Sequence, residues 1–217
     1  MTGFPGSPQL AKGGIVIIDP QTSHVQQVIP LQYNPDTLTR SFQVQGTDGG
    51  DGARSSALRL KGPAVETLKL DAEIDATDLL EVADDDAMEL GIHRELATLE
   101  ALLYPSSRNL NVNNEKAKIG TLEIAPMESA LTLFVWSQER ILPVRITELS
   151  ITEEAFSPSL NPLRAKVSLG MRVLSVDDLG FEHKGGGLFM TYLTRKEQLR
   201  DRNTQAQLNS LGIGGIG

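Results

Sequence analysis

The sequence contains no cysteine, only three histidines and few aromatic residues. Without cysteine the chain cannot form disulfides or thiolate metal sites, and it has no cysteine nucleophile. His24, His93 and His183 lie far apart, and none stands in a metal-ligand pair. Aromatic residues make up 5% of the chain, with one tryptophan, Trp136, which disfavours a large aromatic-lined ligand cavity. We therefore expect no catalytic residue, no metal and no cofactor.

Long apolar runs and an excess of basic charge are also missing. No stretch approaches the ~20 apolar residues of a membrane span. The N-terminus lacks the charged start and apolar centre of a signal peptide. The 28 acidic residues outnumber the 20 basic ones, and the net charge of -8 argues against a sequence-independent nucleic-acid binder. These absences predict a soluble, cytoplasmic protein without a nucleic-acid partner and without direct membrane insertion.

The dominant pattern in the chain is that of β-strands. With 217 residues, 40% of them hydrophobic, the chain can bury one sizeable core. The β-branched run Gly14–Asp19 ends at Pro20 and predicts a short buried strand. Similar runs and alternating patterns predict further strands at Val28–Tyr33, Leu38–Gln45, Glu66–Asp75, Gly120–Ala125, Ala130–Ser137, Leu142–Phe156 and Leu163–Leu174.

The longest predicted strands have one apolar and one charged face. In Leu163–Val173 the apolar residues occupy every second position, and Arg164, Lys166 and Arg172 lie on the opposite face. This charged face is either an ordinary solvent-exposed side or a surface that faces a channel or an adjoining subunit. In Leu142–Phe156 the apolar phase slips between Ile146 and Leu149, which predicts a β-bulge.

Helical periodicity is limited to two segments. Leucines and an isoleucine form one stripe over Ile92–Leu103, before Pro105, and a second helix is possible over Phe189–Leu208. We interpret Gly46–Gly62 as a long mobile loop or the tip of an extended hairpin, Asn109–Asn114 as a polar loop, and Gly185–Gly187 as a hinge. The acidic cluster Asp84–Asp86 lacks the glycine turn of a calcium loop and suits a solvated loop before a helix.

The order of these elements predicts a mainly β fold of the α+β class. Strands follow strands, so we expect an antiparallel β-barrel or sandwich with one flanking helix at about 91–104. The predicted domain organisation is an N-terminal arm (1–12), a barrel domain (13–175) and a polar, glycine-rich C-terminal extension (176–217).

Two segments resemble a known family. Ile29–Ser41, which contains Tyr33-Asn34-Pro35, resembles a segment of the tube-initiator proteins of contractile injection systems and of related phage tail proteins. Leu142–Phe156, continued through Leu160–Val167 with Asn161-Pro162 in the turn, is similar to a pair of strands in the same family. The resemblance covers roughly residues 13–175.

The resemblance implies a tail-tube fold, in which six copies close into a homo-hexameric ring whose strands line a lumen. Such a ring is a structural part of a phage-tail-like baseplate, not an enzyme. It joins the spike or hub protein to the inner-tube protein, templates the growth of the tube, and contacts baseplate wedge and sheath proteins. Many relatives add a C-terminal LysM domain, but residues 176–217 are too few and too glycine-rich for one.

Two other functions stay open: an inner-tube or cap subunit of the same kind of particle, and a particle-associated cell-wall enzyme or binding protein. A cell-wall enzyme would need a catalytic carboxylate in a cleft, and a cell-wall-binding protein would need an aromatic platform for sugars. The residues that we expect to take part in assembly or to line the lumen are Tyr33, Asn34, Pro35, Asn161, Pro162, Arg164, Lys166 and Arg172.

Overall fold

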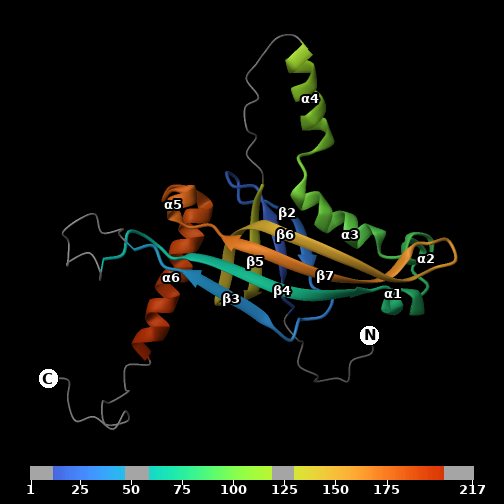
Figure 1. Ribbon diagram of the computed structural model, residues 1–217, viewed down its shortest axis with the longest axis horizontal. Coiled ribbons are helices and arrows are strands. Elements are labelled where there is room, and N and C mark those ends of the chain that lie inside the picture. Colours follow the sequence, from blue (N-terminus) through green and yellow to red (C-terminus); the bar gives the residue numbers. More distant parts are fainter. Residues whose placement is uncertain (1–11, 47–58, 119–129, 203–217) are drawn as a thin grey trace, which may run out of the picture.

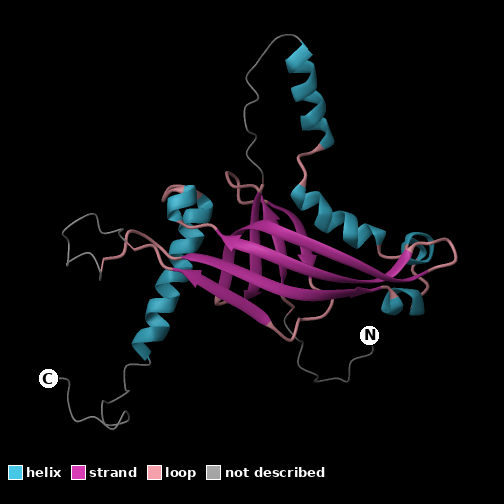
Figure 2. Ribbon diagram, viewed as in Figure 1, coloured by secondary structure: helices cyan, strands magenta, loops and turns pink. Residues whose placement is uncertain are grey.

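The computed structural model describes residues 12–46, 59–118 and 130–202. Within these ranges, seven strands form one antiparallel sheet in the order β2-β1-β5-β6-β7-β4-β3 (Figures 1 and 2). The predicted mainly β, α+β fold class is confirmed. The strands are β1 Gly14–Ile18, β2 Val25–Pro30, β3 Leu38–Gln43, β4 Val65–Asp75, β5 Leu131–Ser137, β6 Arg140–Phe156 and β7 Pro162–Val173.

Most predicted strands lie where the patterns place them, with one shift. β2 begins and ends three residues earlier than predicted, because the chain leaves the sheet after Pro30 and bends over the following residues. The bulge predicted in β6 is confirmed by a register shift between Ile146 and Glu148 opposite β7. The predicted strand Gly120–Ala125 lies outside the described residues, as do residues 1–11 of the arm.

The ends of the segment Gly46–Gly62 indicate a hairpin. Gly46 bridges to Leu60, and the backbone N–H of Lys61 donates to the carbonyl of Gln45 at 2.9 Å, so the chains that continue β3 and β4 still run side by side. Residues 47–58 between them lie outside the described part of the chain.

Helices flank the sheet rather than alternating with its strands (Figure 1). The helix predicted at Ile92–Leu103 is confirmed as α3, His93–Glu100, with the 3-10 turn η1, Ala101–Leu103. The helix predicted at Phe189–Leu208 is present as α6, which begins five residues earlier, at Lys184, while residues 203–208 lie outside the described part of the chain. The remaining helices are α1 Thr77–Glu81, α2 Asp85–Leu90, α4 Ser107–Lys118 and α5 Val176–Leu179, and α6 spans Lys184–Arg202. No helix of the described residues is long and apolar enough to cross a membrane.

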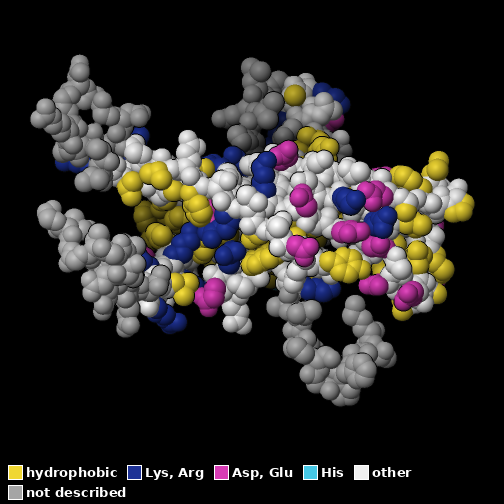
Figure 3. Space-filling view, turned by 60° about the horizontal axis from the view of Figure 1, so that its bottom comes forward, with side chains coloured by type: hydrophobic (Ala, Val, Ile, Leu, Met, Phe, Trp, Pro, Cys, Tyr) yellow, Lys and Arg dark blue, Asp and Glu magenta, His cyan; other side chains and the backbone are white. Residues whose placement is uncertain are grey.

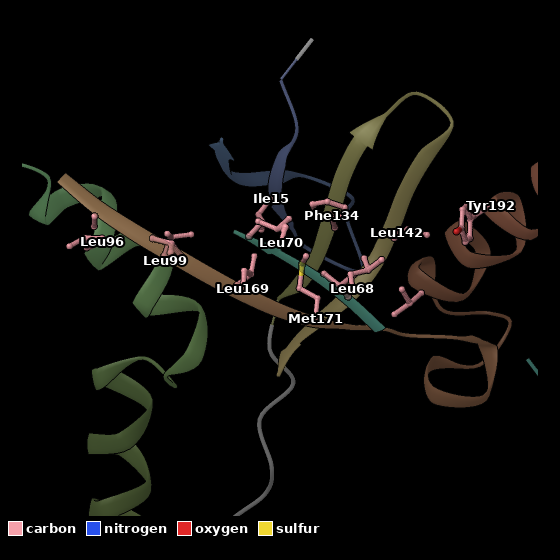
Figure 4. Close-up of a cluster of buried hydrophobic side chains, with 14 of the residues drawn as sticks. Ile15, Leu68, Leu70, Leu96, Leu99, Phe134, Leu142, Leu169, Met171 and Tyr192 are labelled. Carbon is pink, nitrogen blue, oxygen red and sulfur yellow. The ribbon is translucent and has the colours of Figure 1, made fainter. Parts of the chain in front are cut away.

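One hydrophobic core joins the sheet to α3 and α6 (Figure 4). Leu96 and Leu99 come from α3, and Phe189 and Tyr192 come from α6. Between them lie apolar side chains of five strands, all at most 3% exposed: Ile15, Leu68, Leu70, Phe134, Leu142, Leu169 and Met171. Part of the segment after residue 175 thus belongs to the same core as the strands, while the domain division stays a prediction.

The interpretation of Asn109–Asn114 as a loop is wrong, because this segment lies inside α4. The helix buries no residue, so its sequence has no apolar stripe from which a helix could be predicted. Local hydrogen bonds support it instead. The hydroxyl of Ser106 accepts from the N–H of Asn109 at 3.3 Å, and Lys118 pairs with Glu115 at 2.7 Å.

The hinge predicted at Gly185–Gly187 is also wrong. These residues form the first turn of α6, and Gly185 and Gly186 are buried. His183 caps this turn, since its Nδ1 accepts from the N–H of Gly185 at 3.0 Å. A Cβ on Gly186 would lie 1.9 Å from the carbonyl oxygen of Gly180. Glycine therefore serves close packing of the helix start here, not flexibility.

Candidate assembly interface

The face of the sheet opposite the core carries ion pairs across β4, β7 and β6. Arg164 lies between Glu154, at 3.4 Å, and Glu73, at 3.8 Å. Lys166 pairs with Glu154 at 2.9 Å. In the space-filling view, acidic and basic side chains interleave on the face shown (Figure 3). The predicted faces of β7 are confirmed, since Lys166 is 65% exposed while Val167 is 3% exposed.

Glu154 is the shared anion of this ion-paired face. Its pKa is lowered, first by the hydrogen bond from Lys166 and also by the charges of Lys166 and Arg164, while desolvation, the second-largest effect, opposes the shift. The carboxylate therefore stays charged at neutral pH and links both cations. The side chains of Lys166 and Arg164 are 65% and 44% exposed and that of Glu154 is 30% exposed, so water screens these ion pairs and they add little to stability.

The structure brings Tyr33, Asn34 and Pro35 onto the same face. They lie in the connection between β2 and β3 and line a groove of about 510 Å³ together with Lys166 and Asp71. The side chain of Asn34 accepts from the N–H of Gly13 at 2.9 Å, which ties this turn to the start of β1. Tyr33 is 46% exposed, and its pKa is raised, mainly by desolvation. The turn is thus well placed for contact with a partner.

Asn161 and Pro162 hold the β6–β7 hairpin against the start of α3. The Nδ2 of Asn161 donates to the carbonyl of Glu89 at 2.5 Å, and the carbonyl of Pro162 accepts from the N–H of Ile92 at 2.9 Å. Gly91 has φ 61°, and a Cβ on it would lie 2.2 Å from the carbonyl oxygen of Pro162. Only glycine fits this junction. These two predicted residues therefore have a structural role in addition to any role in assembly.

Arg172 stands apart from Arg164 and Lys166. It pairs with Asp178 at 2.7 Å, and its side chain is 28% exposed. Asp178 also belongs to the capping box of α5, in which it accepts from the backbone N–H of Ser175 at 2.9 Å. Arg172 thus links the end of β7 to α5, at the opposite end of the strand from Arg164.

A buried charged cluster that the sequence interpretation missed joins α6 to the sheet. The side chain of Glu66 is 4% exposed and pairs with Arg40 on β3, at 2.7 Å, and with Lys196 on α6, at 3.2 Å. The hydroxyl of Tyr192 lies 3.3 Å from both carboxylate oxygens. The sequence contained evidence for this cluster. Glu66 lies two residues before Leu68 in β4, so its side chain lies on the same face as Leu68, the face that packs on the core.

Tyr192 should make the protein sensitive to alkali. Burial, followed by the charge of Glu66, raises the pKa of Tyr192 from 10.0 to about 12. The folded state therefore favours the protonated phenol. This stabilisation is complete below pH 10 and is lost as the pH rises toward 12. We expect the free energy of unfolding, measured in urea between pH 8 and 12, to fall less steeply for Tyr192→Phe than for the wild type.

The matched control is Tyr104→Phe, since Tyr104 is 69% exposed. This variant should keep the wild-type slope against pH. Equal slopes for Tyr192→Phe and the wild type would show that Tyr192 ionises alike in the folded and unfolded states.

The histidines and the acidic cluster Asp84–Asp86 lie at turns and helix starts in the described part of the chain. No group of three or more His, Asp or Glu side chains in this part of the chain is placed to hold a metal ion. His24 and His93 are exposed at the end of a turn and at the start of α3, and His183 caps α6. Asp84 caps α2 by accepting from the N–H of Ala87 at 3.0 Å, which agrees with the predicted role of the acidic cluster at a helix start.

Comparison with known proteins gives a family. No curated protein matches the sequence significantly. Among solved structures, a chain from the tail of an empty GTA particle, refined helically with C6 symmetry, covers 74% of this chain and 90% of its own length, at 11% identity and a TM-score of 0.30. The family profile of the contractile injection system tube protein matches residues 9–178. With its core strands and both predicted motifs inside that range, the chain belongs to the contractile injection system tube protein family.

Proposed function

We propose that this protein is the tube initiator of a contractile, phage-tail-like injection particle. Six copies would form a ring that joins the spike or hub protein to the inner-tube protein and templates the growth of the tube. Membership of the tube protein family supports a structural subunit. The similarity of Ile29–Ser41 and Leu142–Val167 to initiator segments supports the finer assignment.

The ion-paired face of β4, β7 and β6 is the observation that supports a subunit lining a lumen, which is the part of this proposal that the initiator shares with an inner-tube subunit. One sheet packs its apolar face on the core and leaves the other face covered by alternating charges such as Lys69, Glu148 and Lys166, each about two-thirds exposed. Surfaces of mixed charge resist adhesion of passing protein, which a conducting lumen requires. The sheet edge at β3 is unpaired among the described strands and could be covered by a neighbour in a closed ring.

The second candidate is an inner-tube subunit of the same particle. The description of the family names the tube and favours this candidate. Both candidates use the same fold and neither requires catalysis, so we propose a structural protein that works inside an assembled particle in the cytoplasm. Its other contacts would be with wedge and sheath proteins.

Copy number separates the two candidates. We expect quantitative mass spectrometry of purified particles to find one ring of this chain per particle, far fewer copies than the sheath protein. Native mass spectrometry of the released ring should give a homo-hexamer. A copy number equal to that of the sheath would identify an inner-tube subunit and contradict the initiator role. A chain that stays monomeric inside the particle would contradict both candidates.

A further inference from the structure

A cavity of about 320 Å³ opens in the sheet where β2 approaches β4 beneath α3. That volume is within the range of ligand-binding pockets. Apolar side chains line its floor, among them Ile15, Leu70, Leu99 and Leu169. Residues of two strands form its sides, Gln27–Pro30 of β2 and Leu70, Ala72, Glu73 and Ile74 of β4. The cavity is thus a mainly apolar slot between the edges of two strands.

Both sides of this slot present backbone groups that lack a strand partner among the described residues. β2 is the last strand at its end of the sheet. β3 pairs with β4 only as far as Leu70, so the stretch from Asp71 onward has no neighbour on that side. Unpaired strand edges recruit an extended chain, because their N–H and C=O groups retain hydrogen-bonding capacity.

At one end of the slot, the side-chain amide of Gln32 makes the two hydrogen bonds that the backbone of a neighbouring strand would make. Its Nε2 donates to the carbonyl of Asp75 at 2.7 Å, and its Oε1 accepts from the N–H of Asp75 at 2.8 Å. By the two-residue period of a strand, the backbone groups of Glu73 and Asp71 point the same way as those of Asp75. Leu31 donates to Gly13, so by the same period Val28 directs its backbone N–H away from β1, toward the slot.

One polar atom at the slot also lacks a partner. Oε1 of Glu95 accepts from Arg94 at 3.1 Å, whereas Oε2 is buried and receives no hydrogen bond from the described residues. Glu95 lines the slot. A buried carboxylate oxygen without a donor is costly, so an N–H that reached this oxygen would stabilise the protein.

The chain itself supplies a segment at the mouth. The carbonyl of Gly13 accepts from the N–H of Leu31 at 2.8 Å, and Leu31 and Gln32 both line the slot. The eleven residues before Lys12 have no charged side chain and include Phe4, Pro5, Pro8 and Leu10. Eleven residues reach up to about 36 Å when extended, and proline favours an extended chain at a small entropic cost.

We propose that residues 1–11 bind in this slot of their own chain, with an apolar side chain in the cavity and backbone hydrogen bonds to the edges of β2 and β4. The arm would lie along the slot as an extended segment, in which Pro5 and Pro8 offer a carbonyl acceptor but no N–H donor. This inference does not depend on the role of the protein in an injection particle.

Hydrogen exchange of the full chain and of a chain lacking residues 2–10, followed by NMR, tests the proposal. We expect the amides of Val28, Asp71 and Glu73 to exchange at least about tenfold more slowly in the full chain. A synthetic peptide of residues 1–11 should restore this protection to the shortened chain in a saturable manner. Identical exchange in both chains would overturn the proposal. Protection that disappears on dilution would place a second copy's arm in the slot and would overturn binding within one chain.

Two variants of β2 supply a matched pair. Val28 lines the slot and is 58% exposed, whereas Val25 is 48% exposed and does not line it. In the full chain, Val28→Glu should abolish the arm-dependent protection of Asp71 and Glu73, and Val25→Glu should leave it unchanged. Core amides of β7 report whether each variant is folded. Equal protection at Asp71 and Glu73 in both folded variants would overturn the assignment of the slot.

Discussion

Leu169→Ala is expected to destabilise the protein by about 3 kcal/mol, because it removes a buried side chain from the centre of the sheet. Leu169 is 3% exposed and contacts the core between β4 and β6, its pairing partners being Leu70 and Leu149 (Figure 4). The methyl groups lost would leave a cavity that rigid neighbouring strands cannot refill. The free energy of unfolding in urea measures this loss.

Lys166→Glu is the control on the same strand. Lys166 is 65% exposed, and its pairing with Glu154 is screened by water. We expect the free energy of unfolding to change by less than about 1 kcal/mol, while assembly of rings or passage of charged cargo changes. A loss comparable to that of Leu169→Ala would contradict the assignment of the two faces of β7.

Gly186→Ala is expected to cost about 3 kcal/mol, since it forces a methyl group into the carbonyl of Gly180. The built Cβ lies 1.9 Å from that oxygen, and backbone atoms cannot turn aside as a flexible side chain would. The first turn of α6 must therefore move, and this movement disturbs the packing of Phe189 and Tyr192 in the core. Urea unfolding should show the loss.

Gly187→Ala, one residue later, should change the free energy of unfolding in the opposite direction. A Cβ on Gly187 meets nothing within 4 Å, and the residue lies in the helix. Alanine should then stabilise the protein by about 0.5–1 kcal/mol, because glycine is a poor helix former. If both variants destabilised the protein equally, general strain in the first turn, not the contact with Gly180, would be the cause.

Local sequence patterns were enough to predict most of the described strands, their buried and exposed faces, and membership of the tube protein family. Alternation in β4 and β7 places apolar side chains on one face at every second position, and that local rule holds wherever one face is buried. The β-bulge after Ile146 could be predicted for the same reason. An extra residue in a strand moves every later side chain to the opposite face, which shifts the apolar alternation. The stripe of α3 and the two motifs around Asn34 and Asn161 needed no knowledge of distant contacts.

Contacts between segments far apart in the chain could not be predicted from local patterns and became known only from the fold. The glycines that start α6 look like a hinge until Gly180 is seen against Gly186. Helix α4 buries nothing, so it left no periodic signal. Glu66 takes its partners from β3 and α6, and no local pattern names Lys196, 130 residues away. Side-chain alternation is a local property of a strand, whereas close approach and charge pairing depend on where the fold places the rest of the chain.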